Sequence, residues 1–234
     1  MPVRHLMDSN VFISLRFPLD ANHGRATELL SGLAGAPRLT RSAGYEVAEI
    51  TRSKLNRLVE RIYADTDVLD ASVEPDVKRD EVDQLLDSLE REQRLGTFLT
   101  LVRTFCQGEF ERGHHNLDNL ADWALDLSSG VVTDVLRESG ARKLDGLPGP
   151  IDDEDMEFIA ACEAAIGKRP IRGEKDRRIF WDVIACSRRH DDIVFVTFDA
   201  EFAEEMSKAV GMLVDSGLLE DGAIRTVDLN RESP

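Results

Sequence analysis

The stretch IVFVTFDAEF, residues 193–202, decides the fold class of this 234-residue chain. Its first five residues are apolar or β-branched, a pattern typical of a strand buried on both faces of a sheet. Asp199 follows almost at once, and a helical pattern then runs through residues 200–210. A buried strand that leads directly into a helix predicts a parallel sheet covered by helices.

The rest of the chain continues this alternation of strands and helices. Strands are predicted at residues 3–7, 37–40 and 224–229, and helices at residues 22–33, 42–64, 152–166 and 174–189. Residues 73–139 are charged and helical in period, and Gly and Pro mark a loop at 144–150. We therefore expect a three-layer α/β/α fold with a central, mainly parallel sheet. Its core would comprise residues 1–64 and 150–234, with residues 65–149 forming a helical insertion or cap on the same domain.

The composition indicates a protein of the reduced cytoplasm. No apolar run approaches the ~18 residues that a transmembrane helix needs, and the N-terminus MPVRHLMDSN lacks the long apolar segment of a secretion signal. The three cysteines form no CxxC pair, which predicts neither a zinc site nor a disulfide framework. We expect a cytoplasmic location and no membrane partner.

The charge distribution is uneven. The formal charge of −16 argues against binding of a polyanion over the whole surface, because phosphate contacts need local Lys and Arg. Eight of the 29 basic residues nevertheless lie within residues 168–189. This cluster is either a phosphate-binding patch or a solvated helix face with local ion pairs, and charge alone favours neither.

Two of the predicted strands lead directly into an aspartate, Asp8 and Asp199. Ligand sites in open α/β sheets form at the carboxyl ends of the strands, so both side chains are expected in one crevice. Adjacent carboxylates repel unless a cation lies between them, and hard oxygen ligands select Mg²⁺ or Mn²⁺. Either aspartate alone could simply cap the helix or turn that follows. The pair favours a metal site.

Further acidic ligands are expected from two helices. Helical periodicity places Asp176 on the apolar face of the helix at 174–189, near its start. Asp182 falls on the side of two arginines, where it is most simply a solvated ion-pair partner. The helix at 42–64 offers Glu46 and Glu49 one turn apart, and helical phase does not separate them.

Taken together, these residues resemble the PIN-domain ribonucleases. The matching segments are Asp8-Ser9-Asn10, Thr40 with Glu46, Val47-Ala48-Glu49-Ile50, the helix headed by Asp176, and Thr197-Phe198-Asp199-Ala200-Glu201-Phe202. The resemblance covers roughly residues 1–64 and 150–229, in the family's order. Small toxin-type members lack such an insertion and have a shorter interval between Asp176 and Thr197, which keeps Asp182 as a reserve ligand.

The resemblance implies a metal-dependent endoribonuclease that hydrolyses mainly single-stranded RNA. It assigns one or two Mg²⁺ or Mn²⁺ ions to Asp8, Glu46 or Glu49, Asp176 (or Asp182) and Asp199, with Asn10 and Thr197 orienting ligands or contacting phosphate. The RNA backbone would contact Lys168, Arg169, Arg172, Lys175, Arg177 and Arg178. The role is that of a toxin with a cognate antitoxin or of an RNA-processing nuclease. The insertion would be a lid, a specificity element or a homodimer surface.

Two alternatives stay open at this point. Haloacid-dehalogenase-like phosphatases also begin with a strand-end aspartate, but they need a second acid two residues later, where this chain has Asn10. The other alternative is a PIN-like scaffold without activity that binds a basic partner through its acidic surface. His114 and His115, which lie in a turn-like segment, are expected to be a surface pair without partners.

Overall fold

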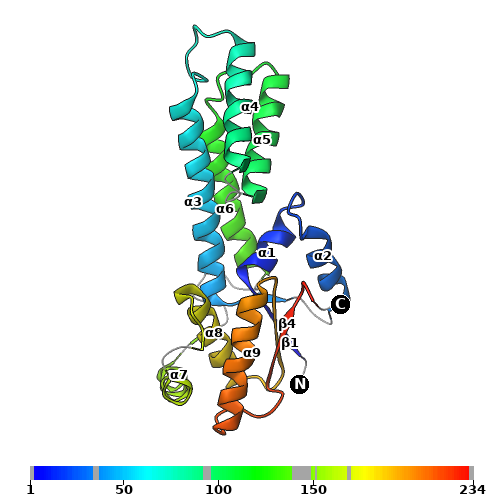
Figure 1. The fold of residues 1–234 in the computed structure, drawn as a ribbon, viewed down its shortest axis with the longest axis vertical. Helices are drawn as coiled ribbons and strands as arrows, with labels where there is room; N and C mark the ends of the chain where they lie inside the picture. Colours follow the sequence, from blue (N-terminus) through cyan, green and yellow to red (C-terminus); the bar gives the residue numbers. More distant parts are fainter. Residues whose placement is uncertain are drawn as a thin grey trace. The chain divides into compact units, whose positions relative to one another are not determined.

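The computed structural model describes residues 3–33, 37–91, 96–138, 149–150, 152–167 and 170–231 (Figure 1). The strands are β1 (Arg4–Met7), β2 (Arg38–Leu39), β3 (Ile193–Thr197) and β4 (Ile224–Asp228). The helices are α1 (Ser9–Arg16), α2 (His23–Gly32), α3 (Arg41–Asp65), α4 (Pro75–Arg91), α5 (Gly96–Glu111), α6 (Leu120–Glu138), α7 (Asp153–Ile166), α8 (Glu174–Ser187) and α9 (Ala200–Asp215). The chain is therefore an α/β protein that is mostly helical. Most of the loop expected at 144–150 lies outside the described residues.

The described strands form one parallel sheet in the order β2-β1-β3-β4. Every residue of β3 is buried, as its sequence predicts, and β3 pairs with β1 on one side and β4 on the other. β2, the next strand in the chain, lies beside β1 at one edge of the sheet. The chain then crosses over, and β3 pairs with the opposite edge of β1. The carboxyl ends of β1 and β3 therefore flank a topological switch point, where ligands bind in open α/β sheets.

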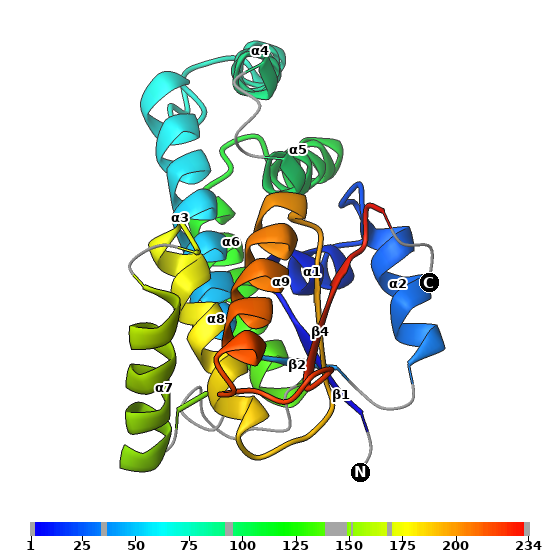
Figure 2. The same cartoon turned by 60° about the horizontal axis from the view of Figure 1, so that its bottom comes forward.

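Helices pack against β3, as its apolar residues predict. α8, α9 and α1 all contact this strand, and α9 also contacts β4 (Figure 2). The sequence did not predict α1, in which Val11 and Phe12 are buried directly after the polar segment at the end of β1. None of the described helices is long and apolar enough to span a membrane.

The chain divides into two compact units. The first comprises Met1–Arg16, Asn22–Val47 and Thr133–Pro234 and contains the sheet. The second comprises Phe17–Ala21 and Ala48–Val132, and it holds most of α3, all of α4 and α5, and most of α6. Within it, α4 and α5 contact each other around buried residues such as Leu86 and Val102. The expected domain bounds at 64 and 150 stay a prediction.

Candidate functional site

Asp8 is a buried carboxylate at the carboxyl end of β1. Its side chain is only 4% exposed. Oδ1 accepts a hydrogen bond from the Ser9 amide at 2.7 Å, and Oδ2 accepts one from the Thr197 hydroxyl at 2.7 Å. Burial raises the pKa of Asp8 to about 7, helped by the nearby charges of Glu46 and Asp176, although the two hydrogen bonds act in the opposite direction. The fold thus holds a carboxylate where its negative charge is disfavoured.

Thr197 joins the carboxyl ends of β1 and β3. It is fully buried, and besides donating to Asp8 its hydroxyl accepts from the Asp199 amide at 2.9 Å and from Asn10 Nδ2 at 3.2 Å. The Asn10 carbonyl oxygen accepts from the Phe198 amide at 3.2 Å. These contacts fix the Asp8 carboxylate between two strands. They also place Asn10 and Thr197 next to that carboxylate, where the sequence analysis expects orienting residues.

Asp199 begins α9 as its N-cap. Its Oδ1 accepts a hydrogen bond from the Phe202 amide at 2.9 Å, which satisfies one of the free N–H groups at the helix start. The capping role considered for this residue therefore exists. One cap bond does not occupy the whole carboxylate, and the exposed Asp199 also contributes to the raised pKa of Asp176.

Glu46, on α3, is linked to Asp8 through Ser9. The Ser9 hydroxyl donates to Glu46 Oε2 at 2.7 Å and lies 3.4 Å from Asp8 Oδ1. Lys175 Nζ lies 4.0 Å from the other carboxylate oxygen. Glu49, the alternative ligand, is exposed and lies in the Ala48–Val132 segment of the second unit. Of the two glutamates, Glu46 is the one that the structure connects to Asp8.

Asp176 completes a group of four acids. It is half-buried at the start of α8, and its carboxylate lies so close to Gly173 that a Cβ at that position would collide with it. Burial is the largest cause of a raised pKa of Asp176. The negative charges of nearby acids raise that pKa further, in the order Glu46, Asp199, Glu205 and Glu201. Mutual repulsion thus connects Asp176 with Asp8, Glu46 and Asp199.

The expectation that Asp182 is a solvated ion-pair partner is wrong. Its side chain is 4% exposed, and Oδ2 accepts a hydrogen bond of 2.6 Å from the Ser42 amide at the start of α3. The reason is that α3 begins against this face of α8, so a free helix N–H group meets the carboxylate there. Burial raises the pKa of Asp182 to about 6, although the hydrogen bonds of Ser42 and the charge of Arg41 oppose the shift.

The buried Asp182 carboxylate should make the stability of the folded protein depend on pH. Its folded pKa of about 6 lies above the ordinary value of 3.8, so the folded protein binds this proton more tightly than the unfolded chain. The stability from this group is complete below about pH 4 and is lost as pH rises through 6. Because asparagine keeps an acceptor for the Ser42 amide, Asp182→Asn should raise the free energy of unfolding at pH 8 by on the order of 2–3 kcal/mol.

Urea denaturation of both proteins at pH 4, 6 and 8 measures this gain, which should shrink toward zero at pH 4. The exposed Asp221 gives a matched control, since Asp221→Asn removes the same charge without relieving burial. An equal gain for Asp182→Asn at pH 4 and pH 8 would contradict the interpretation.

Acidic side chains neutralise much of the basic cluster. Arg172 pairs with Glu201 at 2.7 Å and Glu205 at 3.2 Å, and Arg178 pairs with Glu174 at 2.6 Å. In the same cluster, Arg188 and Arg189 both pair with the buried Asp155, and Arg177 Nη2 donates to the Ile171 carbonyl at 3.4 Å. These contacts favour the ion-pair alternative for the arginines. Lys168 and Arg169 lie outside the described residues.

The sequence analysis overlooked Asp228, a third strand-end aspartate. It pairs in register with Thr197, at the end of β4, and its side chain is 10% exposed. Oδ1 accepts from the Asn230 amide at 2.9 Å, and Arg231 Nε lies 3.4 Å from Oδ2. The signal was present in the sequence, because Val227-Asp228 repeats the strand-then-aspartate pattern of Asp8.

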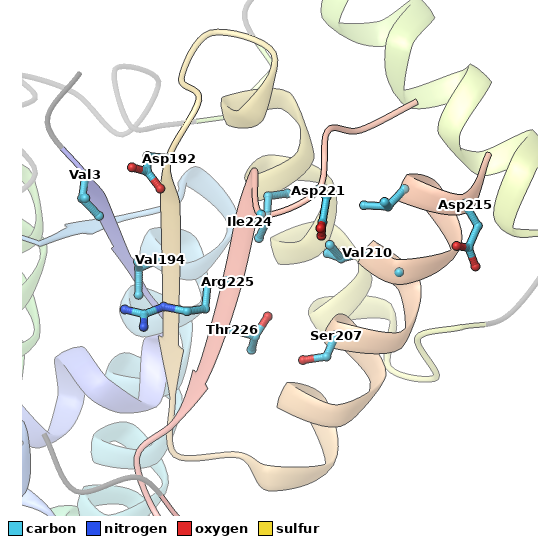
Figure 3. A pocket seen from close by; sticks show the side chains of 13 residues that line it. Val3, Asp192, Val194, Ser207, Val210, Asp215, Asp221, Ile224, Arg225 and Thr226 are labelled. Atoms are coloured by element: carbon cyan, nitrogen blue, oxygen red, sulfur yellow. The ribbon is translucent and has the colours of Figure 1, made fainter. Parts of the chain in front are cut away.

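No group of three or more His, Cys, Asp or Glu side chains among the described residues stands in a metal-binding arrangement. A cavity of about 660 Å³ does lie in the first unit, as Figure 3 shows, but at the opposite ends of the strands. Its lining includes Asp192 and Ile224, at the starts of β3 and β4, and the second half of α9. None of the four acids Asp8, Glu46, Asp176 and Asp199 lines it.

The chain was compared with protein families, curated proteins and solved structures. No protein-family model, no curated protein and no solved structure matches the chain.

Proposed function

We propose that this protein is a divalent-metal-dependent endoribonuclease with a PIN-like, three-layer α/β/α core. The observation that carries the proposal is the buried Asp8 carboxylate, held by Thr197 and Ser9 at the switch point of the sheet. A protein gains no stability from burying a carboxylate beside other acids, so this arrangement calls for a cation. Perturbed acids that gather at a switch point are typical of functional sites.

The chemistry of the donors fits Mg²⁺ or Mn²⁺. The oxygens of Asp8, Glu46, Asp176 and Asp199 are all hard ligands, and no thiol or imidazole is among them. Each Asp8 oxygen has one close hydrogen-bond donor, which leaves a lone pair on each for a metal. Asp8 would be the central ligand, with Glu46, Asp176 and Asp199 completing the site. When bound, the ion lowers the pKa of an attacking water and stabilises charge on the phosphate.

The neighbouring side chains would position these ligands. Thr197 and the Ser9 amide hold the Asp8 carboxylate in one orientation, and the Ser9 hydroxyl does the same for Glu46. Lys175 lies near Glu46 and is well placed to contact a phosphate oxygen of the substrate. A haloacid-dehalogenase-like phosphatase is disfavoured, because the position of its second acid is occupied by Asn10, whose amide bonds to Thr197 and Phe198.

Cleavage of labelled single-stranded RNA tests this proposal. We expect internal cleavage with Mn²⁺ or Mg²⁺, its loss when EDTA is added, and its recovery when the ion is restored. Single-stranded DNA and p-nitrophenyl phosphate serve as parallel substrates, and the latter detects phosphatase activity. Cleavage that persists in EDTA, or hydrolysis of p-nitrophenyl phosphate alone, would contradict the proposal. A toxin role, an antitoxin or homodimer partner and a cytoplasmic location stay predictions from the sequence.

A further inference from the structure

The second unit contains a polar cavity that the proposed function does not use. Its volume is about 640 Å³, within the range of small-molecule sites. Its lining comes from the loop that precedes α4, from the loop that joins α5 to α6, and from Lys78 at the start of α4. Figure 1 shows the helices that these loops join. All of its lining residues fall within the second unit, so this cavity is separate from the acids at Asp8.

Lys78 is a buried cation whose hydrogen-bond partner is neutral, and the exposed Asp70 acts on it only through its charge. Its side chain is 2% exposed, and its ammonium donates to Asn116 Oδ1 at 2.5 Å. Within the part of the chain that the structure describes, this ammonium has no other hydrogen-bond acceptor and no carboxylate within 4.0 Å. A buried charge is costly unless an opposite charge or several hydrogen bonds compensate it. Two of the three ammonium hydrogens are therefore left to bind an anion.

A buried carboxylate orients the neighbouring side chains. Glu109 is 2% exposed, and Oε2 accepts from Asn119 Nδ2 at 2.7 Å and from His114 Nδ1 at 2.9 Å. These hydrogen bonds hold the pKa of Glu109 below its usual range. Because a carboxylate only accepts, His114 carries its proton on Nδ1 and keeps Nε2 for another partner. His114 lies on the surface as expected, with 62% of its side chain exposed, but the expectation that it has no partner is wrong.

His115 contributes a ring nitrogen without a hydrogen bond. Its ring stacks on Phe110 with centroids 6.1 Å apart and planes inclined by 18°. Nδ1 is shielded from solvent and has no hydrogen-bond partner among the described residues. A buried polar atom without a hydrogen bond is costly, and a bound ligand is one way to complete its hydrogen bonding. His115 lines the same cavity as Lys78.

From these contacts we infer that the cavity binds a compact phosphomonoester, with its phosphate against Lys78, Asn116 and His115. A phosphate presents several acceptor oxygens, which suits the free hydrogens of Lys78 and the ring N–H of His115. The exposed acids Glu74 and Asp118 also line the cavity. They would repel an extended polyanion such as an RNA backbone, which favours a small ligand that reaches the lysine. The inference does not rest on the proposed nuclease activity.

Calorimetric titration of the full chain with inorganic phosphate and with AMP tests the inference, and adenosine serves as the ligand without phosphate. We expect both phosphates to bind with a Kd of about 1 mM or tighter, and adenosine not to bind. Lys78→Met keeps the apolar stem and removes the charge, and it should weaken binding at least about tenfold. His115→Phe preserves the stacked ring, removes the orphaned nitrogen, and should weaken binding several-fold.

Lys208→Met is the matched control, because Lys208 is an exposed lysine on α9 in the first unit. It should leave phosphate binding unchanged. A single-stranded RNA with and without a 5′-phosphate separates the two sources of the ligand, and we expect AMP to bind more tightly than either. Preference for the RNA, no binding of either phosphate to the wild-type protein, or wild-type affinity in both Lys78→Met and His115→Phe would overturn the inference.

Discussion

Asp8→Asn should abolish RNA cleavage and leave the protein at least as stable as the wild type at pH 8. The carboxylate lies between Ser9, Thr197 and the other acids, so its loss removes the central ligand of the proposed metal site. We expect the rate to fall at least about 10³-fold, which corresponds to about 4 kcal/mol of lost transition-state stabilisation. Single-turnover cleavage of a labelled RNA measures the effect.

The stability of this variant distinguishes a functional acid from a structural one. The folded pKa of Asp8, about 7, lies above the ordinary value of 3.8, so its contribution to stability is present below about pH 4 and lost as pH rises through 7. At pH 8 the wild type therefore retains a buried charge that asparagine removes. A melting temperature for Asp8→Asn at or above the wild-type value is expected, as is common for active-site acids.

The exposed Asp221 again provides the matched control, and Asp221→Asn should cleave RNA at the wild-type rate. Cleavage by Asp8→Asn at the wild-type rate would remove Asp8 from the mechanism. A large drop in its melting temperature would instead assign the carboxylate a structural role.

Mn²⁺ should raise the melting temperature of the wild-type protein. Ion binding to the folded state at 100 times its Kd contributes about 2.7 kcal/mol. For a chain of this size that corresponds to roughly 5–10 °C. The ion also relieves the repulsion among Asp8, Glu46 and Asp176, which supplies the driving force.

The same thermal scan on variants identifies the ligands. Asp8→Asn should lose nearly all of the shift, and Glu46→Gln should lose a large part of it, whereas Glu49→Gln should retain it. Sodium chloride at matched ionic strength serves as the reference for general charge screening. An equal Mn²⁺ shift in Asp8→Asn and the wild type would show that the ion binds elsewhere.

The sequence predicts those parts of the fold that depend on a local pattern. The strand at residues 193–197 has the predicted bounds, because five consecutive apolar or β-branched residues suit only a doubly covered position. The sequence also predicts that the residues at the ends of these two strands lie at one edge of the sheet, and Thr197 there bonds to both the Asp8 carboxylate and the Asp199 amide.

The error for Asp182 arises because a distant segment decides the environment of its side chain. Helical phase gives the angular position of Asp182 but not the start of α3 that donates to it, so a buried acid was taken for a solvated one. The error for His114 is local, because the chain turns back after α5 and brings this ring against Glu109, a residue of the last turn of that helix. Asp228 was missed for a different reason. The strand itself is predicted at residues 224–229, but Asp228 falls inside that predicted range and so does not read as a residue that follows a strand.

A crystal structure of the protein soaked with Mn²⁺, with anomalous diffraction measured to locate the ion, tests the central claim most directly. We predict an anomalous peak at the carboxyl ends of β1 and β3, within about 2.0–2.6 Å of an Asp8 oxygen and of at least one oxygen from Glu46, Asp176 or Asp199. A well-occupied Mn²⁺ peak elsewhere in the molecule, with none within reach of Asp8, would contradict the claim that these acids form a metal site.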